Sequence, residues 1–320
     1  MDYEEIKLFR ERYIHKQKDY QSLNTFHDRL TWQTINTAIQ KVEEEQGKSP
    51  APFAFFVMGS AGRCEQSVWT DQDHGIVYRG GSDEKDYFLE LGEEIAAGLE
   101  VIGYPRCEGK VMASEPMWTH STDNWINQVE KWLEEATWQS LRHFSTFFDS
   151  RVVIGESSLL DEIKRSTFNF LDNNPEVYRR LIDNVSFLRK GIGIFGQLLP
   201  EQSGPMTGSI HLKTTTFFPY VNSLRLLALM DHHLRASTVD RFIYLKENYP
   251  FLIEYEDQFK RLLEFRYEHT RLARNYEEVH YVSLAKLSKS DKQELKQFMK
   301  SGAELFEKTK SLIEKECLSW

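Results

Sequence analysis

The sequence has few cysteines, and they are widely spaced. Cys64, Cys107 and Cys317 are the three among 320 residues, and no CxxC pair occurs. An odd, scattered set excludes a disulfide framework and the common zinc and redox motifs. It is typical of reduced thiols, so we expect a cytoplasmic protein whose Cys64 and Cys107 are small packed residues.

Long apolar runs and an excess of positive charge are also lacking. The most apolar segment, 217–230, carries Arg225 in its middle, and the N-terminus has no apolar signal region. A membrane span needs about 18 apolar residues, so we expect no membrane insertion. The formal net charge of −9 argues against broad nucleic-acid binding, although a small nucleotide pocket stays possible.

What the sequence does have is enough apolar and aromatic residues, 40% and 13%, for a real core. The length favours about two domains. Helical patterns cover residues 3–46, with a break near Leu23. Strand and helix patterns then alternate up to residue 156. Beyond it, apolar spacing predicts helices throughout, near 158–172, 175–190, 219–234, 238–248, 252–275 and 290–315.

This order predicts an α+β protein with three parts. Residues 1–50 form helices packed on the domain that follows, 51–156 form that domain, a small mixed sheet with helices, and 157–320 form an all-helical C-terminal domain. The run 53–58, FAFFVM, is typical of a buried strand. Segment 110–114 is a candidate short strand. The stripe of Trp125, Val129 and Trp132 indicates a helix packed in the core.

One stretch, Met58 to Tyr78, combines features that suit a phosphate and a cation. A buried strand runs into Gly59-Ser60, where glycine lets a ligand approach the backbone and serine adds a hydroxyl. Arg63 offers a fork of donors for phosphate. Asp71 and Asp73 then share one face of a second strand, and two such carboxylates suit Mg²⁺ or Mn²⁺. The alternative for the aspartate pair is a solvated turn.

A third acid would complete a two-metal site. Asp149 is the candidate, because segment 145–155 has the composition of a strand whose alternation puts Asp149 and Arg151 on one face. Asp149 could instead form a salt bridge with Arg151, and Arg63 one with Glu65 or Asp71. Lys110 could reach the phosphates or be an exposed lysine.

At these residues the chain resembles the DNA-polymerase-β-like nucleotidyltransferase superfamily, whose signature is a Gly-Ser turn followed by Asp-x-Asp. It is most similar to the nucleotidyltransferase family related to PII-protein uridylyltransferases, often found behind CBS or cyclic-nucleotide-binding modules. The blocks that carry the resemblance are GSAGRCEQSVWTDQDHGIVY, GYPRCEGKVMASEPMW, FFDSRVVIG and HLKTTTFFPYVNSLRLLAL, which together extend across nearly the whole chain.

The resemblance implies transfer of a nucleoside monophosphate from an NTP to a hydroxyl acceptor, with an acceptor on a regulatory protein as one option. It places the triphosphate on Gly59 and Ser60 near Arg63. Asp71, Asp73 and Asp149 would hold the metal ions, with Asp149 also deprotonating the acceptor. Lys110 and Lys213 would lie near phosphate, although a surface position for Lys213 is equally compatible.

Two departures bear on the acceptor, and a second function stays open. Glu115 stands where the family has an asparagine, and His211 where an acid precedes the lysine. The nucleotide, the acceptor, the source of regulatory input and the oligomeric state are not predicted. The alternative is a non-enzymatic sensor that binds a nucleotide in the same cleft and signals through the helical domain.

Overall fold

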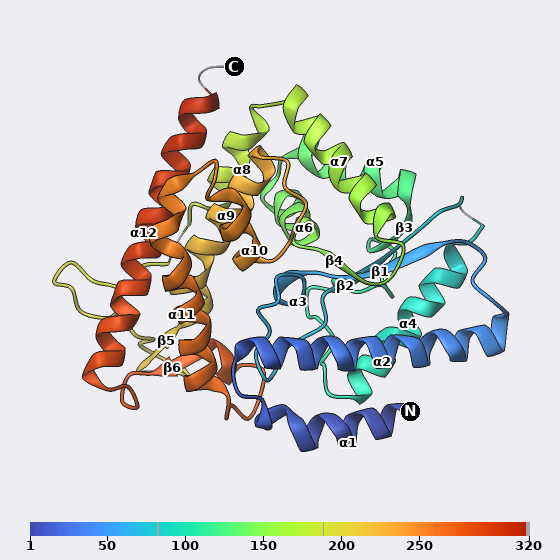
Figure 1. The fold of residues 1–320 in the computed structure, drawn as a ribbon, viewed down its shortest axis with the longest axis horizontal. Coiled ribbons are helices and arrows are strands. Elements are labelled where there is room, and N and C mark those ends of the chain that lie inside the picture. The colour runs from blue at the N-terminus through green and yellow to red at the C-terminus, as the bar shows by residue number, and fades with distance from the viewer. Residues whose placement is uncertain (82, 188, 318–320) are drawn as a thin grey trace. The chain divides into compact units, whose positions relative to one another are not determined.

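The computed structural model describes residues 1–81, 83–187 and 189–317 (Figure 1). The described chain divides into two compact units, residues 1–170 with 234–236, and residues 171–233 with 237–320. The division falls inside α7 (Ser157–Asn173). The domain boundary near residue 156 stays a prediction.

The first unit is built on a four-stranded mixed sheet. Its strands are β1 (Phe53–Val57), β2 (His74–Tyr78), β3 (Thr119–Ser121) and β4 (Arg151–Gly155), in the order β3-β2-β1-β4. Strand β1 is antiparallel to β2 and to β4, and β2 is parallel to β3. The two central strands are almost fully buried, as their continuous apolar sequence predicts.

Helices cover both faces of this sheet (Figure 1). On one face, Phe53 and Tyr78 pack on Phe88 of α4 (Lys85–Val101). On the other, Phe56 contacts Trp125 of α5 (Thr122–Glu135) and Phe147 of α6 (Trp138–Phe148). The tryptophan stripe is therefore core packing, as predicted.

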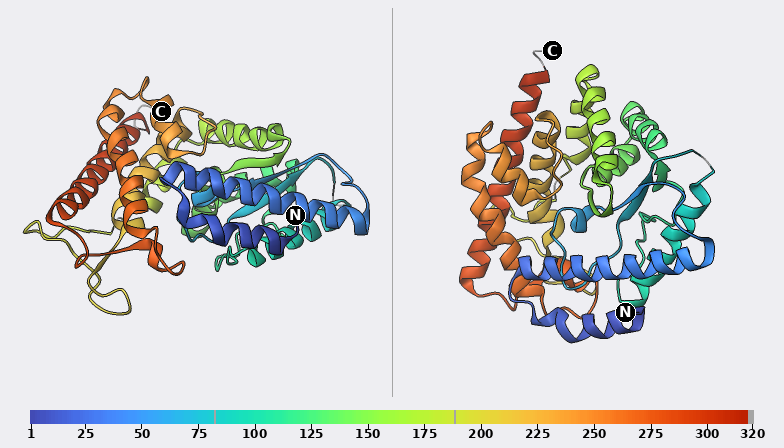
Figure 2. Two further views of the ribbon diagram at one scale, coloured as in Figure 1. Left: turned by 60° about the horizontal axis from the view of Figure 1, so that its bottom comes forward. Right: turned by 45° about the vertical axis from the view of Figure 1, so that its right-hand side comes forward.

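The N-terminal helices lie against the α4 side of the sheet. They are α1 (Tyr3–Tyr13) and α2 (Tyr20–Gln46), which run side by side (Figure 2). The expected break near Leu23 is wrong, because the interruption falls at residues 17–19. Asp19 caps α2 there by accepting a hydrogen bond from the Ser22 amide at 2.7 Å. A capping aspartate outweighs the local apolar pattern.

Two predicted strands differ from the structure. Segment 110–114 forms no strand. The expected strand over 145–155 begins only at Arg151, because residues up to Phe148 continue helix α6. Leu141, Phe144 and Phe148 are buried at helical spacing, and this amphipathic pattern prevails over the β-propensity of the phenylalanines.

The second unit is mainly helical. Helix α9 (Phe218–Met230) is its centre, since every residue from Pro219 to Leu229 is buried. The other helices are α8 (Val177–Val185), α10 (Thr238–Leu245), α11 (Ile253–Thr270) and α12 (Lys289–Cys317), with a π-helix, η2 (Lys213–Phe217), leading into α9. A two-stranded antiparallel sheet, formed by β5 (Ser209–His211) and β6 (Tyr281–Ser283), departs from the all-helical expectation.

Candidate nucleotide and metal site

The Gly-Ser turn lies at the end of β1 as a single helical turn, α3 (Gly59–Gly62). Gly59 has φ +56°, and a Cβ there would lie 2.4 Å from Oδ2 of Asp73. A Cβ on Gly62 would lie 1.8 Å from the backbone oxygen of Asp149. Both glycines are thus needed for close approach, and the turn packs directly on two of the three predicted acids.

Asp71 and Asp73 converge with an unexpected partner, Cys107. One ligand atom of each, a carboxylate oxygen or the sulfur, lies within 4.8 Å of the other two. All three side chains are partly exposed. Ligands of one ion lie roughly 3 to 4.5 Å apart for metal–ligand distances of about 2.0 to 2.3 Å, so this group fits a divalent cation.

Buried neighbours fix the two aspartates just before β2. Gln72, between them, points the other way: its side-chain amide donates to the backbone oxygens of Ala96 and Tyr104 at 3.1 and 2.8 Å. Its carbonyl oxygen accepts a hydrogen bond from Nε2 of His74 at 3.0 Å. The backbone oxygen of Asp73 accepts from the Met58 amide at 2.8 Å. The two aspartates therefore do not lie on the strand as expected, since β2 begins at His74, but Gln72 still points away from them and the carboxylates lie together.

The loop that carries Cys107 is tied to the same segment on both sides of the cysteine. The Gln72 amide donates to the Pro105 oxygen at 3.2 Å, and the His74 amide donates to the Val111 oxygen at 3.1 Å. Nδ1 of His74 also accepts the Ala113 amide at 3.0 Å. Burial, with Arg106 nearby, lowers the pKa of His74 to about 3, so the ring is neutral and keeps this pattern.

Electrostatics at Cys107 reflect the two carboxylates. Burial, followed by the negative charges of Asp73 and Asp71, raises the pKa of the Cys107 thiol to about 12, although hydrogen bonds from the loop amides oppose the rise. The cysteine is therefore a protonated thiol beside the acids at neutral pH. The interpretation of Cys107 as merely packed missed this placement, because a loop residue gives no periodic signal.

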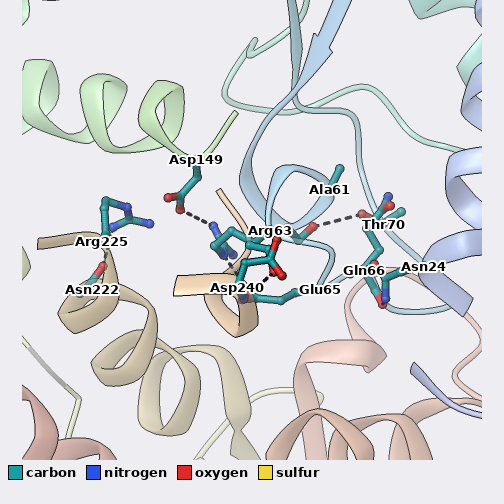
Figure 3. A network of polar contacts seen from close by, with 12 residues as sticks. Asn24, Ala61, Arg63, Glu65, Gln66, Thr70, Asp149, Asn222, Arg225 and Asp240 are labelled. Carbon is teal, nitrogen blue, oxygen red and sulfur yellow. Dashed lines mark hydrogen bonds and ion pairs between the residues drawn. The ribbon is translucent and has the colours of Figure 1, made fainter. Parts of the chain in front are cut away.

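Arg63 and Asp149 form a buried ion-pair group with Glu65 (Figure 3). Nε of Arg63 donates to Glu65 at 2.8 Å and Nη1 donates to Asp149 at 2.9 Å. The exposed fractions are 12% for Arg63, 3% for Glu65 and 0% for Asp149. Burial alone would lower the pKa of Arg63, but the two carboxylates outweigh it and raise the pKa above its usual value.

Asp149 thus takes a different position from the one expected. It follows the last residue of α6 rather than lying on a strand, and its carboxylate binds Arg63. The alternative salt bridge with Arg151 is also wrong, since Arg151 pairs with Asp28 and donates to the Ala61 oxygen at 3.0 Å. Asp149 is not part of the group formed by Asp71, Asp73 and Cys107.

The remaining predicted residues are spread more widely. Ser60 lies in the turn with its hydroxyl 3.5 Å from that of Thr70. Lys110 is exposed, with φ +55°, in the tight turn after Cys107. Lys213 belongs to the second unit, where it is exposed at the start of η2. Contacts of Ser60, Lys110 and Lys213 with a nucleotide stay predictions.

The loop between α3 and Asp71 is anchored by the N-terminal helices. Asn24 of α2 accepts the Gln66 amide at 2.7 Å (Figure 3). His27 contacts the Ser67 oxygen at 2.9 Å, and Arg10 of α1 donates to the Val68 oxygen at 3.2 Å. Sequence alone gave no reason to connect these helices to the site.

A mixed sheet with a Gly-Ser turn and an adjacent Asp-x-Asp pair defines the nucleotidyltransferase class, and comparison with known families agrees. Residues 4–139 match the family "Putative nucleotidyltransferase DUF294", and residues 175–312 match "Putative nucleotidyltransferase substrate binding domain". The two matches span most of the chain, which belongs to this nucleotidyltransferase family. No curated protein matches the sequence. In the described part of the chain, no helix combines the length and apolar character that crossing a bilayer requires.

Proposed function

We propose that the protein transfers a nucleoside monophosphate from an NTP to a hydroxyl acceptor, with Mg²⁺ or Mn²⁺ bound at Asp71 and Asp73. The observation that carries this proposal is the meeting of the two carboxylates, with Asp73 packed on Gly59. The family match supports the same class of reaction. Carboxylate oxygens are the ligands that these cations take in sites that also hold substrate phosphates.

In this proposal each residue near the turn has a physical task. Asp71 and Asp73 bind the cation, which when bound neutralises charge on the attacking and leaving oxygens. Gly59 leaves the backbone open to the triphosphate, Ser60 offers a hydroxyl, and Lys110 extends from the neighbouring loop. Rate enhancement then comes mainly from positioning and preorganised charge.

Asp149 and Arg63 have a conditional part in the chemistry. Asp149 is fully buried and its Oδ2 accepts a hydrogen bond from Arg63, so a cation or the proton of the acceptor has to share this carboxylate with the guanidinium or replace it. Arg63 uses Nε for Glu65 and Nη1 for Asp149, so a phosphate would share the guanidinium with these two carboxylates. The proposal keeps both residues in the site, with Asp149 as the third acid.

The finer identity of the reaction follows the resemblance. From this resemblance we propose a uridylyltransferase-like activity with a regulatory protein as acceptor. We also propose that Lys213 lies near the phosphates and that the protein takes part in signal transduction. The helical unit matches a substrate-binding domain, which supports a role in binding a substrate.

A second candidate is a nucleotide sensor without transfer activity. The observation that favours it is the complete burial of Asp149 in its pair with Arg63, which leaves two acids rather than three in the candidate metal-binding group. Such a protein would bind NTP and cation at Asp71 and Asp73 but move no nucleotidyl group.

One experiment separates the two candidates. The full chain is incubated with each of four α-³²P-labelled NTPs, Mg²⁺ or Mn²⁺ and host lysate, and label in protein and small molecules is followed together with equilibrium NTP binding. Transfer that is lost in Asp71→Asn/Asp73→Asn supports the enzyme. Binding without transfer supports the sensor. Wild-type transfer by a folded double variant contradicts the assigned site.

A further inference from the structure

The third protein ligand nearest to the aspartate pair is a sulfur atom. Among the His, Cys, Asp and Glu side chains that the structure describes, Cys107 has a donor atom within 4.8 Å of both Asp71 and Asp73, whereas Asp149 lies outside this group and is paired with Arg63. A site with two carboxylates and one sulfur has a different cation preference from a site with three carboxylates, because thiolate is a soft ligand.

Backbone hydrogen bonds on both sides of Cys107 fix the position of this residue. Backbone hydrogen bonds join the segment around Asp73 to Pro105 and to Val111, which flank the cysteine by two and four residues. Between them the Lys110 amide closes a tight turn on the Cys107 oxygen at 3.0 Å. These hydrogen bonds therefore hold the loop that carries Cys107 against the segment that carries the two carboxylates.

We infer that Cys107 is the third protein ligand of the cation bound at Asp71 and Asp73, and that the site therefore takes Zn²⁺ or Cd²⁺ more readily than a three-carboxylate site does. This inference rests on the proposed cation site. On binding, a metal–sulfur bond forms, the S–H bond breaks, and the proton passes to solvent.

The test uses a property of sulfur ligation that does not depend on activity. Cd²⁺ bound to a thiolate gives a ligand-to-metal charge-transfer band in the ultraviolet, whereas carboxylates give none. The full chain carrying Cys64→Ser and Cys317→Ser has Cys107 as its one thiol. It is titrated with Cd²⁺ by absorbance and, in parallel, by calorimetry. Cys107→Ser, in the natural sequence and in this background, is the matched control.

The inference predicts a band that saturates with one Cd²⁺ and disappears in Cys107→Ser. Cd²⁺ affinity falls by about 10- to 100-fold or more in that variant, while Mg²⁺ affinity changes by less than about threefold, since serine keeps an oxygen in place of the soft ligand. Cys107→Asp reverses the preference toward Mg²⁺. If the double background unfolds, the difference spectrum between wild type and Cys107→Ser gives the same result.

The other outcomes are distinct. Calorimetric Cd²⁺ binding that needs Asp71 and Asp73 but shows no sulfur band overturns the role of Cys107 and leaves the proposed cation site intact. An unchanged band in Asp71→Asn/Asp73→Asn also overturns it, because the thiol would bind Cd²⁺ by itself. No cation binding by the wild type contradicts both the inference and the proposed function.

Discussion

Replacing Arg63 tests whether its ion pairs hold this part of the first unit together. In Arg63→Met the apolar stem is kept, but Glu65 and Asp149 lose the guanidinium that lies 2.8 and 2.9 Å away. Removing one partner of a buried pair costs about 3–5 kcal/mol, because the remaining buried charge loses the attraction of that partner. Against a typical unfolding free energy of about 5–15 kcal/mol, this is a large loss.

Asp149→Asn should cost less, because Arg63 keeps Glu65 and the asparagine amide oxygen can still accept a hydrogen bond. We expect a loss of about 1.5–3 kcal/mol, the contribution of a hydrogen bond to a charged group. The double variant should be more stable than the sum of the two losses predicts, by about 0.5–3 kcal/mol, since the two residues are coupled.

The assay is urea unfolding followed by tryptophan fluorescence, because Trp118 and Trp125 are buried in the first unit. Arg79→Met is the matched control. Its ion pair with Glu162 has the same 2.8 Å length but exposed fractions of 51% and 44%, so its loss should be no more than about 1 kcal/mol. Equal small losses for Arg63→Met and Arg79→Met would refute the reasoning.

Two further predictions concern the turn and the response to acid. Gly59→Ala should lower the free energy of unfolding by about 1–2 kcal/mol, because Gly59 has a positive φ. It should also weaken Mn²⁺ binding, because the new Cβ would displace the Asp73 carboxylate. Gly47→Ala is the control, since Gly47 has φ +87° and nothing within 4 Å, and should leave Mn²⁺ binding unchanged; equal binding by both variants would count against the contact. Burial, with Arg10 nearby, lowers the pKa of His27 to about 3. Below about pH 6.5, His27 therefore binds a proton in the unfolded chain but stays neutral in the folded chain. Its contribution to the free energy of unfolding should be constant above this pH and should fall by about 1.4 kcal/mol per pH unit between pH 6.5 and pH 3. His27→Gln should reduce that slope by this amount in urea titrations at several pH values, and an unchanged slope would show that His27 does not contribute.

Local patterns predicted the parts of the site that depend on neighbours in sequence. The buried run before Gly59 predicted the position of the turn, and the alternation around Gln72 predicted that the two aspartates point the same way, although the strand begins only at His74. Strand burial and side-chain alternation are properties of a few consecutive residues. The division into a mixed sheet followed by helices was also accessible, since helical spacing repeats over long segments.

The pairing of distant residues could not be predicted in the same way. Cys107 lies near Asp73 because backbone hydrogen bonds close the loop between them. Backbone hydrogen bonds do not require particular residue types, so the sequence does not reveal them. Asp149 was expected on a strand because phenylalanine and valine surround it, yet the helical spacing of the preceding apolar residues decides the local structure. Asp149 therefore precedes β4 and pairs with Arg63, whereas Arg151, its alternative partner, pairs with Asp28.

The central claim is that Asp71 and Asp73 together hold a divalent cation beside the Gly59 turn. The most direct test is Mn²⁺ binding to the full chain, measured by electron paramagnetic resonance of free Mn²⁺, with and without NTP. The account predicts saturable binding by the wild type that is lost in folded Asp71→Asn/Asp73→Asn and retained in Glu115→Gln. Equal Mn²⁺ binding by the wild type and the double aspartate variant would contradict it.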